Sequence, residues 1–270
     1  MTETELMLTE VLQCRRVDLL AEQTSLTPEQ EERLQEMKRR RHEGEPIQYI
    51  IGHTDFMNTK IFVDERVLIP RPETEILADL AIKYCQQHFS NRTVHILDIG
   101  TGSGNIAIAL AKNLASTKVT AIDISQEALT LANYNARLNH VEGRIEFINQ
   151  DTKTFTTLAK TSGQKFDLII SNPPYIPTEK LDQLPKDVQY EPLIALDGGP
   201  DGLTYYRLIV QNAPLMLNAN GYLMLELWDG QDAEVGQLLS QQPSFDQIRF
   251  EKDYVGTNRV VIVQLKDNHG

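Results

Sequence analysis

The sequence predicts an α/β fold in which helices cover both faces of a mostly parallel sheet, after a small N-terminal helical domain and a β-hairpin. Three observations support this prediction. Short apolar runs alternate with helix-like segments from about residue 93, two antiparallel strand patterns close the chain, and the first 43 residues show helical spacing only. Such alternation is typical of parallel sheets buried on both faces. The 270 residues are enough for one large domain with a smaller companion.

The N-terminal segment predicts two helices, over residues 4–24 and 28–43. Leucine and valine side chains recur there at roughly helical spacing, and Thr27-Pro28-Glu29 supplies an N-cap, a first-turn proline and a first-turn acid. Two helices cannot bury a core alone, so we expect them to pack on each other and on the strands that follow.

A hairpin is predicted after these helices. The segments Lys60–Asp64 and Arg66–Ile69 have strand patterns that meet at Asp64-Glu65. Pro70-Arg71-Pro72 then ends the pairing, because proline cannot donate a hydrogen bond to a ladder. The expected division of the chain is a helical domain over 1–53, a hairpin linker over 54–69 and an α/β domain over 70–270.

Residues 70–270 are predicted to form seven strands with helices between them. The predicted strands are Val94–Ile99, Lys118–Ile124, Arg144–Asn149, Phe166–Ser171, Tyr222–Leu227, Ile248–Tyr254 and Arg259–Leu265. The predicted helices are Glu73–His88, Asn105–Leu114, Ser125–Leu138 and Thr204–Leu217. We expect the last two strands to pair antiparallel through a turn at Gly256-Thr257-Asn258, which departs from a plain dinucleotide-binding pattern.

A glycine-rich turn follows the first of these strands. Its residues are Gly100, Thr101, Gly102, Ser103 and Gly104. Ligands of open α/β sheets bind beyond the carboxyl ends of strands, where glycine lets backbone approach a ligand and a helix start offers free N–H groups. The spacing is G-x-G-x-G and not the G-x-G-x-x-G of pyrophosphate binders. The alternative is a tight turn that only packs the helix on the strand.

Acidic residues near neighbouring strand ends extend this candidate cofactor site. Asp123 ends the next strand, about twenty residues past the glycines, where a carboxylate can accept hydrogen bonds from a ribose diol. Asp151 and Thr152 follow the third strand, where an adenine edge would lie, and Asp98 could face an ammonium group. A structural role, such as a first-turn charge for a helix, is the alternative for Asp123 and Asp151. An adenosyl ligand without pyrophosphate fits the glycine spacing better than NAD, so the predicted cofactor is S-adenosylmethionine.

The fourth strand runs directly into Asn172-Pro173-Pro174-Tyr175, the most specific motif of the chain. Two prolines stiffen this backbone. An amide nitrogen is a poor nucleophile and needs acceptors for its N–H bonds, which the Asn172 side-chain oxygen and the Pro173 carbonyl can supply. Tyr175 supplies a flat wall for a planar group, and the Asn172 NH₂ can also hold a cofactor carboxylate. The predicted acceptor is a planar amide or amine nitrogen; the alternative is a chance Pro-Pro turn.

Composition restricts the partners. Proteins that bind nucleic-acid phosphates usually have a basic surface, so the net charge of −12 disfavours the binding of a nucleic-acid duplex. The basic run Lys38–Arg41 is either a solvated helix end or a docking patch for an RNA-bound or acidic partner. We expect free thiols at Cys14 and Cys85, and no metal, because the six histidines form no HxxxH or HExxH pattern. No apolar run suits a membrane span and the N-terminus is acidic, unlike a signal peptide, so we expect a cytoplasmic protein. We also expect a monomer.

Further motifs surround these sites. They are Gly44–Gly52, Val67–Glu75, Glu191–Gly199, Asp201-Gly202-Leu203 and Tyr206-Arg207. Together with Asn172–Tyr175, they make the chain resemble the peptide chain release factor N5-glutamine methyltransferases over nearly its whole length. The resemblance implies a Rossmann-like seven-stranded methyltransferase sheet, methylation of the glutamine in the Gly-Gly-Gln motif of release factors, and an N-terminal domain that recognises the release factor. The family usually has another helix before the one expected near Thr4.

Two other functions remain as alternatives. An N6-adenine methyltransferase would share Asn172–Tyr175 and would stack a flipped base on Tyr175. The acidic net charge and the lack of a basic target-recognition segment oppose it. A non-catalytic sensor of S-adenosylmethionine would not need a stiff acceptor loop.

Overall fold

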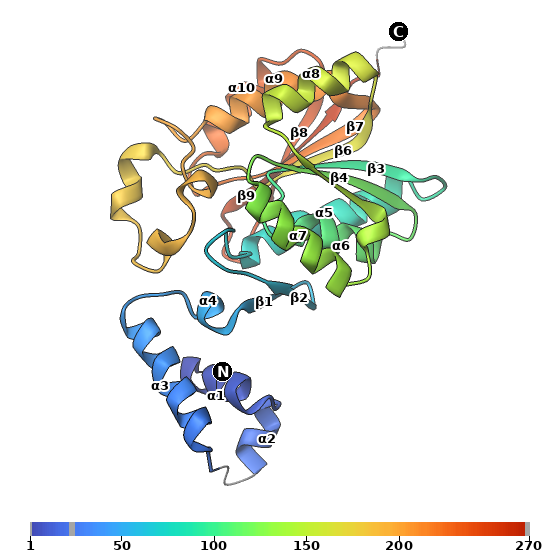
Figure 1. Cartoon of the computed structure of the whole chain (residues 1–270). Helices are drawn as coiled ribbons and strands as arrows, with labels where there is room; N and C mark the ends of the chain where they lie inside the picture. Colours follow the sequence, from blue (N-terminus) through green and yellow to red (C-terminus); the bar gives the residue numbers. More distant parts are fainter. Residues whose placement is uncertain (1, 22–24, 268–270) are drawn as a thin grey trace.

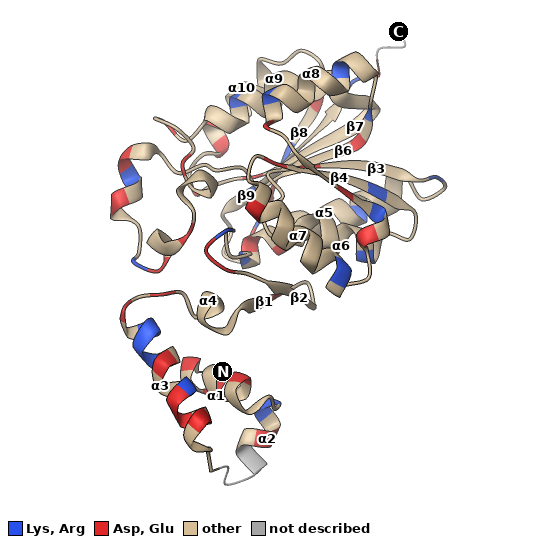
Figure 2. Cartoon of the chain, in the orientation of Figure 1, with Lys and Arg blue, Asp and Glu red and all other residues tan. Residues whose placement is uncertain are grey.

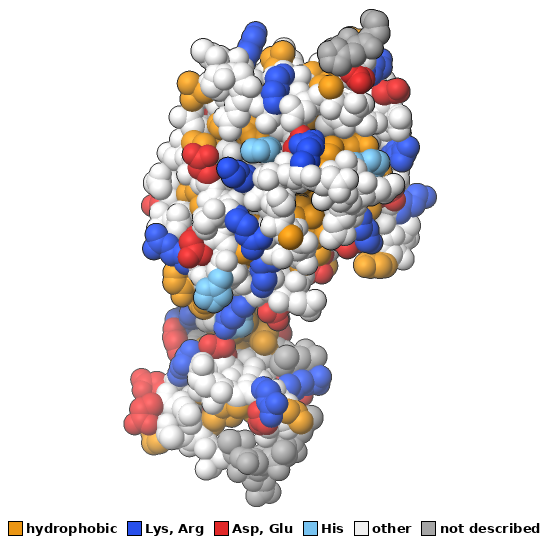
Figure 3. All heavy atoms as spheres, turned by 90° about the vertical axis from the view of Figure 1, so that its right-hand side faces the viewer, with side chains coloured by type: hydrophobic (Ala, Val, Ile, Leu, Met, Phe, Trp, Pro, Cys, Tyr) orange, Lys and Arg blue, Asp and Glu red, His pale blue; other side chains and the backbone are white. Residues whose placement is uncertain are grey.

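The computed structural model describes residues 2–21 and 25–267. It consists of a small helical N-terminal part and a larger α/β part (Figure 1). A narrow waist joins the two parts in the space-filling view of Figure 3. Within the described ranges, no helix has both the length and the apolar character needed to cross a bilayer.

The described residues of the N-terminal part form four helices: α1 (Glu3–Leu12), α2 (Arg16–Ala21), α3 (Pro28–His42) and α4 (Ile47–Ile51). The prediction of one helix over 4–24 is wrong, because Gln13 is left-handed at φ 51° and ends α1; residues 22–24 lie outside the described residues. The helix predicted over 28–43 is confirmed as α3, which the Thr27 side chain caps. A small core joins α1, α3 and α4 and consists of Met7, Val11, Leu34, Met37, Ile47 and Ile50.

The basic run at the end of α3 is paired locally. Arg39 contacts Glu36 at 2.6 Å and Glu43 at 2.5 Å, Arg40 pairs with Glu45, and Arg41 contacts Glu3 at 2.8 Å. Acidic and basic residues accordingly follow one another along the α3 ribbon in Figure 2. This arrangement favours the interpretation of the run as a charged, solvated helix end.

The hairpin lies earlier in the chain than predicted. Its strands are β1 (His53–Phe56) and β2 (Thr59–Phe62), joined by Met57 and Asn58, which both have positive φ as a two-residue hairpin turn requires. The expected strand at Arg66–Ile69 is wrong. Val67 and Ile69 are buried in the core without joining a ladder, and their alternating burial imitates a strand.

The main sheet has seven strands in the order β5-β4-β3-β6-β7-β9-β8. Their bounds are β3 Val94–Ile99, β4 Thr117–Asp123, β5 Ile145–Asn149, β6 Phe166–Ser171, β7 Leu217–Glu226, β8 Phe245–Lys252 and β9 Asn258–Leu265. Strands β5, β4, β3, β6 and β7 run parallel to one another, and β9 is antiparallel to both β7 and β8. The predicted α/β fold with a terminal antiparallel pair is confirmed.

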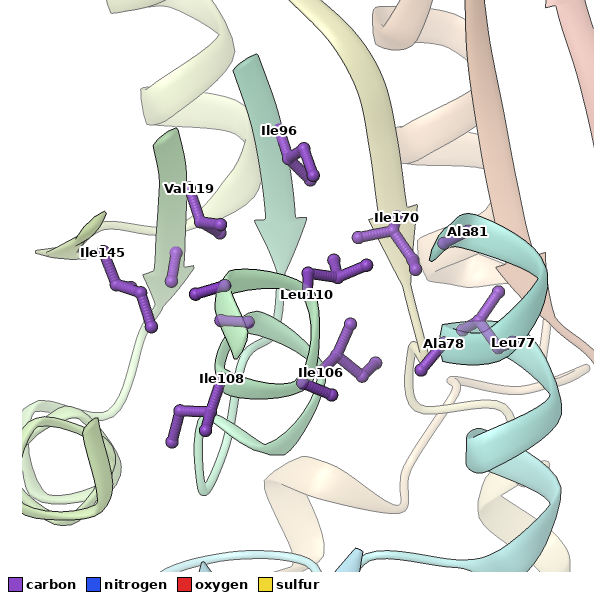
Figure 4. Close-up of a cluster of buried hydrophobic side chains, with 14 of the residues drawn as sticks. Leu77, Ala78, Ala81, Ile96, Ile106, Ile108, Leu110, Val119, Ile145 and Ile170 are labelled. Carbon is purple, nitrogen blue, oxygen red and sulfur yellow. The ribbon is translucent and has the colours of Figure 1, made fainter. Parts of the chain in front are cut away.

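Helices cover both faces of this sheet (Figure 1). One face carries α5 (Pro72–His88), α6 (Asn105–Asn113) and α7 (Gln126–Leu138), and the other carries α8 (Thr152–Ser162), α9 (Thr204–Met216) and α10 (Asp232–Ser240). Figure 4 shows α6 side chains packed between the strands and α5. The sequence interpretation did not include α4, α8 or α10.

The buried side chain of Asn135 on α7 fixes the hairpin against the sheet domain. Its Oδ1 accepts from the Phe62 N–H at 2.8 Å, and its Nδ2 donates to the carbonyls of Phe62 and Ser103, each at 2.9 Å. Tyr49 adds a second anchor, because its hydroxyl donates to the Val67 carbonyl at 2.6 Å. Asn135 therefore links the hairpin to Ser103, in the turn that forms part of the candidate cofactor site.

Candidate active site

A pocket opens at the carboxyl ends of β3, β4, β5 and β6. It contains about 850 Å³ of empty space, part of it open to solvent. Its walls include Gly100, Gly102, Ile122, Asp123, Ile124, Ser125, Ala128, Gln150, Asp151, Thr152, Asn172, Pro173 and Pro174. The chain runs outward from β3 in both directions, so β3 and β6 flank the switch point where open α/β sheets bind ligands.

The glycines of the turn after β3 have two different roles. Gly100 and Gly102 have positive φ, 72° and 54°, and no atom lies within 4 Å of the position that a Cβ would take. They therefore leave open space for a ligand beside the backbone. Gly104, at φ 81°, has no such space, because a Cβ there would meet the Ala132 Cβ at 3.1 Å. This third glycine packs the turn against α7, as the structural alternative proposed.

The side chains of Asp98, Thr101 and Ser103 are buried and do not line the pocket. Thr101 Oγ1 donates to Asp98 Oδ2 at 2.6 Å, whereas Oδ1 is buried without a hydrogen-bond partner among the described residues. Burial raises the pKa of Asp98 to about 7, against the opposing effect of the Thr101 hydrogen bond. A buried carboxylate oxygen without a partner suits a ligand that bears N–H donors or positive charge.

Asp123 lines the pocket at the end of β4. Its Oδ2 accepts from the Gly102 N–H and its Oδ1 from the Ser125 N–H, each at 2.9 Å. Burial raises the pKa of Asp123, and these backbone N–H groups oppose the rise. Each carboxylate oxygen keeps capacity to accept a further hydrogen bond, so Asp123 can fix the turn and bind a diol at once.

Asp151 and Thr152 also line the pocket, where α8 begins. Asp151 is the N-cap of α8 and accepts from the Thr154 N–H at 3.0 Å, and hydrogen bonding to Thr154 lowers its pKa. The capping role weighed for this residue is therefore present. The apolar side chains of Ile122, Ile124 and Ala128 add a wall that suits a flat ring. Together the open glycines, the diol acceptor and this wall fit an adenosyl cofactor.

The loop after β6 forms another side of the pocket. Asn172, Pro173 and Pro174 line it, and Asn172 Nδ2 donates to Thr74 Oγ1 on α5 at 3.2 Å. The Tyr175 ring is not part of this wall. It stacks on Trp228 with ring centroids 6.4 Å apart and an interplanar angle of 8°. The Gln231 Nε2 donates to the Tyr175 carbonyl at 3.1 Å, which ties the end of the loop to the start of α10.

Buried carboxyls stand behind this loop. Glu226, at the end of β7, accepts from the Tyr175 hydroxyl at 3.4 Å, and burial raises its pKa to about 7. Glu191 accepts from the Ile69 N–H at 3.1 Å and pairs with Arg71, so it joins the two segments that flank the pocket. Sequence reasoning did not identify Thr74 or Glu226 as partners of this loop, because both contacts join residues far apart in the chain.

Fold and site together define the class: the protein is an S-adenosylmethionine-dependent methyltransferase. A family described as a methyltransferase domain matches residues 90–262, and the PrmC N-terminal domain family matches residues 1–52. The chain belongs to the release factor glutamine methyltransferase family.

Individual relatives support this membership. The chain is 38% identical to a release factor glutamine methyltransferase of Thermodesulfovibrio yellowstonii, over 97% of this chain and 91% of that protein. The identity to that of Chlorobaculum tepidum is 41%, over 93% and 85%. Among solved structures, a ribosomal protein L11 methylase from Lactobacillus delbrueckii subsp. bulgaricus is 26% identical with a TM-score of 0.51, over 77% of this chain and 86% of that one.

Proposed function

We propose that this chain transfers the methyl group of S-adenosylmethionine to the side-chain amide nitrogen (N5) of the glutamine in the Gly-Gly-Gln motif of peptide chain release factors. The observation that supports this most directly is the position of Asn172–Pro174 on the wall of the adenosyl-type pocket, in a chain 38% identical to a release factor glutamine methyltransferase over 97% of its length. Neither the adenine methyltransferase nor the non-catalytic sensor is favoured by these relatives.

In this proposal, residues after β6 bind the acceptor. The Asn172 Oδ1 and the Pro173 carbonyl accept hydrogen bonds from the glutamine NH₂, and Pro174 shapes the loop. Tyr175, whose ring lies outside the wall of the cofactor pocket, forms a wall of the acceptor site. These acceptors stabilise the positive charge that develops on the nitrogen and align it with the methyl carbon. No strong base is needed, because the nitrogen becomes acidic as methylation begins.

The cofactor would supply an electrophilic methyl group on a sulfonium. We propose that it is held by Asp98, Gly100, Thr101, Gly102, Ser103, Gly104, Asp123, Asp151, Thr152 and Asn172. Within this set, Gly100 and Gly102 give room, Asp123 and Asp151 accept from the nucleoside, and Asp98, Thr101 and Ser103 support the turn.

We also propose that residues 1–53 recognise the release factor, that 54–69 act as a linker and that 70–270 perform the chemistry. Tyr49 is buried in the core of the sheet domain, so a truncation has to end before it. Deletion of residues 1–45 should lower kcat/KM for intact release factor while the affinity for S-adenosylmethionine stays near normal. Equal loss of both would mean that the segment only stabilises the fold.

The chain is proposed to act as a cytoplasmic monomer on a protein substrate, without a nucleic-acid target. The assay uses labelled S-adenosylmethionine with a release factor, with its Gly-Gly-Gln→Gly-Gly-Ala variant and, separately, with DNA. Mass spectrometry of the digested release factor should find one added methyl group on the glutamine. Methylation of adenine alone, with the peptide unmodified, would overturn the proposal.

A further inference from the structure

Glu226 is a carboxyl group in an unusual position. It ends β7 directly behind the Asn172–Tyr175 loop and is only 2% exposed. Within the described ranges its carboxylate forms no ion pair within 4.0 Å, and its Oε2 has no hydrogen-bond partner. Burying a carboxylate without a paired cation is costly, and strongly perturbed carboxyls cluster at functional sites.

Two contacts connect Glu226 to the acceptor loop. The Tyr175 hydroxyl donates to Oε1 at 3.4 Å. The Thr74 hydroxyl on α5 acts on the same carboxyl and lowers its pKa. In active sites without ligand such contacts are often long and tighten once the ligands bind.

Thr74 also determines which atom of Asn172 faces the acceptor. Its Oγ1 accepts from Asn172 Nδ2 at 3.2 Å. A hydroxyl has one hydrogen to donate. When that hydrogen is directed to the Glu226 carboxylate, Thr74 can only accept from the Asn172 amide. The Asn172 Nδ2 then faces Thr74, and its Oδ1 is left free to accept an N–H of the substrate.

We propose that Glu226 is a positioning residue that acts through Thr74 and Tyr175 to hold the Asn172 carboxamide with its oxygen toward the substrate amide. This inference rests on the proposed function. An ionised carboxylate can only accept hydrogen bonds, so it enforces one direction along the chain Asn172 to Thr74 to Glu226. A protonated or amidated side chain can also donate. Thr74 could then donate to Asn172 Oδ1, so that the Asn172 carboxamide turns its NH₂ toward the substrate. The substrate NH₂ is itself a donor and cannot accept a hydrogen bond from the Asn172 NH₂.

The ionisation of Glu226 therefore affects the rate. The groups that act on it are Glu73 and Thr74 on α5, Tyr175 after β6 and Arg259 on β9; Glu73 raises its pKa, and the other three lower it. The effect of burial on this pKa is larger than the effect of any of these groups, and it raises the pKa of Glu226 to about 7. As the pH falls through this range the carboxyl becomes protonated, and kcat/KM should fall with it.

The test compares Glu226→Gln and Thr74→Val with the wild-type chain on the same release factor. Each variant should lower kcat/KM about 10-fold, a fraction of the ~10²–10³ typical for removing a preorganised contact outright. The affinity for S-adenosylmethionine, measured by calorimetry, and the melting temperature should stay near wild type. Thr74→Ser, which keeps the hydroxyl, should restore most of the activity lost in Thr74→Val.

Two readouts separate positioning from packing. In an Asn172→Ala background, Glu226→Gln should cause no further loss, because the amide that it orients is gone. The acid limb of the kcat/KM profile should flatten in Glu226→Gln; an unchanged limb would assign it to another group, such as Asp98, and would overturn the inference. Full activity of Glu226→Gln, or a loss that persists in the Asn172→Ala background, would also overturn it. If the wild-type chain leaves the Gly-Gly-Gln peptide unmethylated, the proposed function fails instead.

Discussion

The two halves of the proposed active site are constructed differently. The cofactor half, at the ends of β3, β4 and β5, consists of short segments whose partners lie nearby: Thr101 bonds to Asp98 three residues away, and Gly102 bonds to Asp123 across neighbouring strands. The acceptor half depends on distant partners. Asn172 is held by Thr74, 98 residues earlier, and Tyr175 by Glu226, 51 residues later.

This difference has a functional meaning. A binding site for a constant cofactor can be defined by backbone shape, which a few glycines and one acid specify. An acceptor site must hold an amide in one orientation, and a flexible carboxamide needs support from outside its own loop. Substitutions in the two halves should therefore separate cofactor affinity from methyl transfer, and each prediction below tests that separation.

Asn172→Ala should have the largest effect. It removes the group proposed to accept the substrate N–H, so the rate of methyl transfer to release factor should fall by ~10²–10³. Cofactor affinity should change little, which calorimetry with S-adenosylmethionine can measure. A variant that loses cofactor and activity together would show that the two halves are not separable at this residue.

Asn172→Asp sharpens the same test. A carboxylate still accepts hydrogen bonds, but it lacks the NH₂ that donates to Thr74 and places a charge in a pocket for a neutral group. We expect this variant to be impaired and yet more active than Asn172→Ala. The opposite ranking would mean that the added charge outweighs the retained acceptor.

The same contrast explains how far the sequence could predict the molecule. The seven-stranded sheet follows from local alternation, and the turn at Gly100–Gly104 from its spacing. The hairpin was misplaced because Met57 adopts a left-handed conformation that is unusual for methionine, so Asn58 alone marked the turn, while buried Val67 and Ile69 imitate a strand. Thr74 could not be identified as a partner of Asn172, because only the folded chain brings α5 to the end of β6.

Each half contains one buried carboxyl with a pKa raised to about 7, Asp98 on the cofactor side and Glu226 on the acceptor side. A carboxyl whose pKa is higher in the folded state than in the unfolded state stabilises the fold at pH values below its unfolded-state pKa. This contribution is lost as the pH rises through its folded-state pKa. The free energy of unfolding of the cofactor-free chain should therefore fall between about pH 4 and pH 8.

Denaturant titrations across this range test the effect. Asp98→Asn and Glu226→Gln should each flatten the fall, by at most about 4 kcal/mol for Asp98→Asn and about 3 kcal/mol for Glu226→Gln. Burial also raises the pKa of Asp123 and Glu191, so part of the slope should persist in both variants. An unchanged slope in both would mean that neither carboxyl titrates in this window.

Asp123→Ala should have the smallest effect, and this effect should be on cofactor affinity in the cofactor half of the site. It removes a carboxylate that accepts from the Gly102 and Ser125 N–H groups and is proposed to accept from the ribose diol. Losing hydrogen bonds to a charged acceptor typically costs about 1–3 kcal/mol, or roughly 5–150-fold in the Kd for S-adenosylmethionine. Asp123→Asn is the matched control, because it keeps one acceptor oxygen and should lose less. With saturating cofactor, both variants should recover most of the wild-type kcat, since the Asn172–Thr74–Glu226 contacts are untouched. Unchanged cofactor affinity would remove Asp123 from the site, and a kcat that stays low at saturation would show that the turn at Gly102 also aligns the acceptor half.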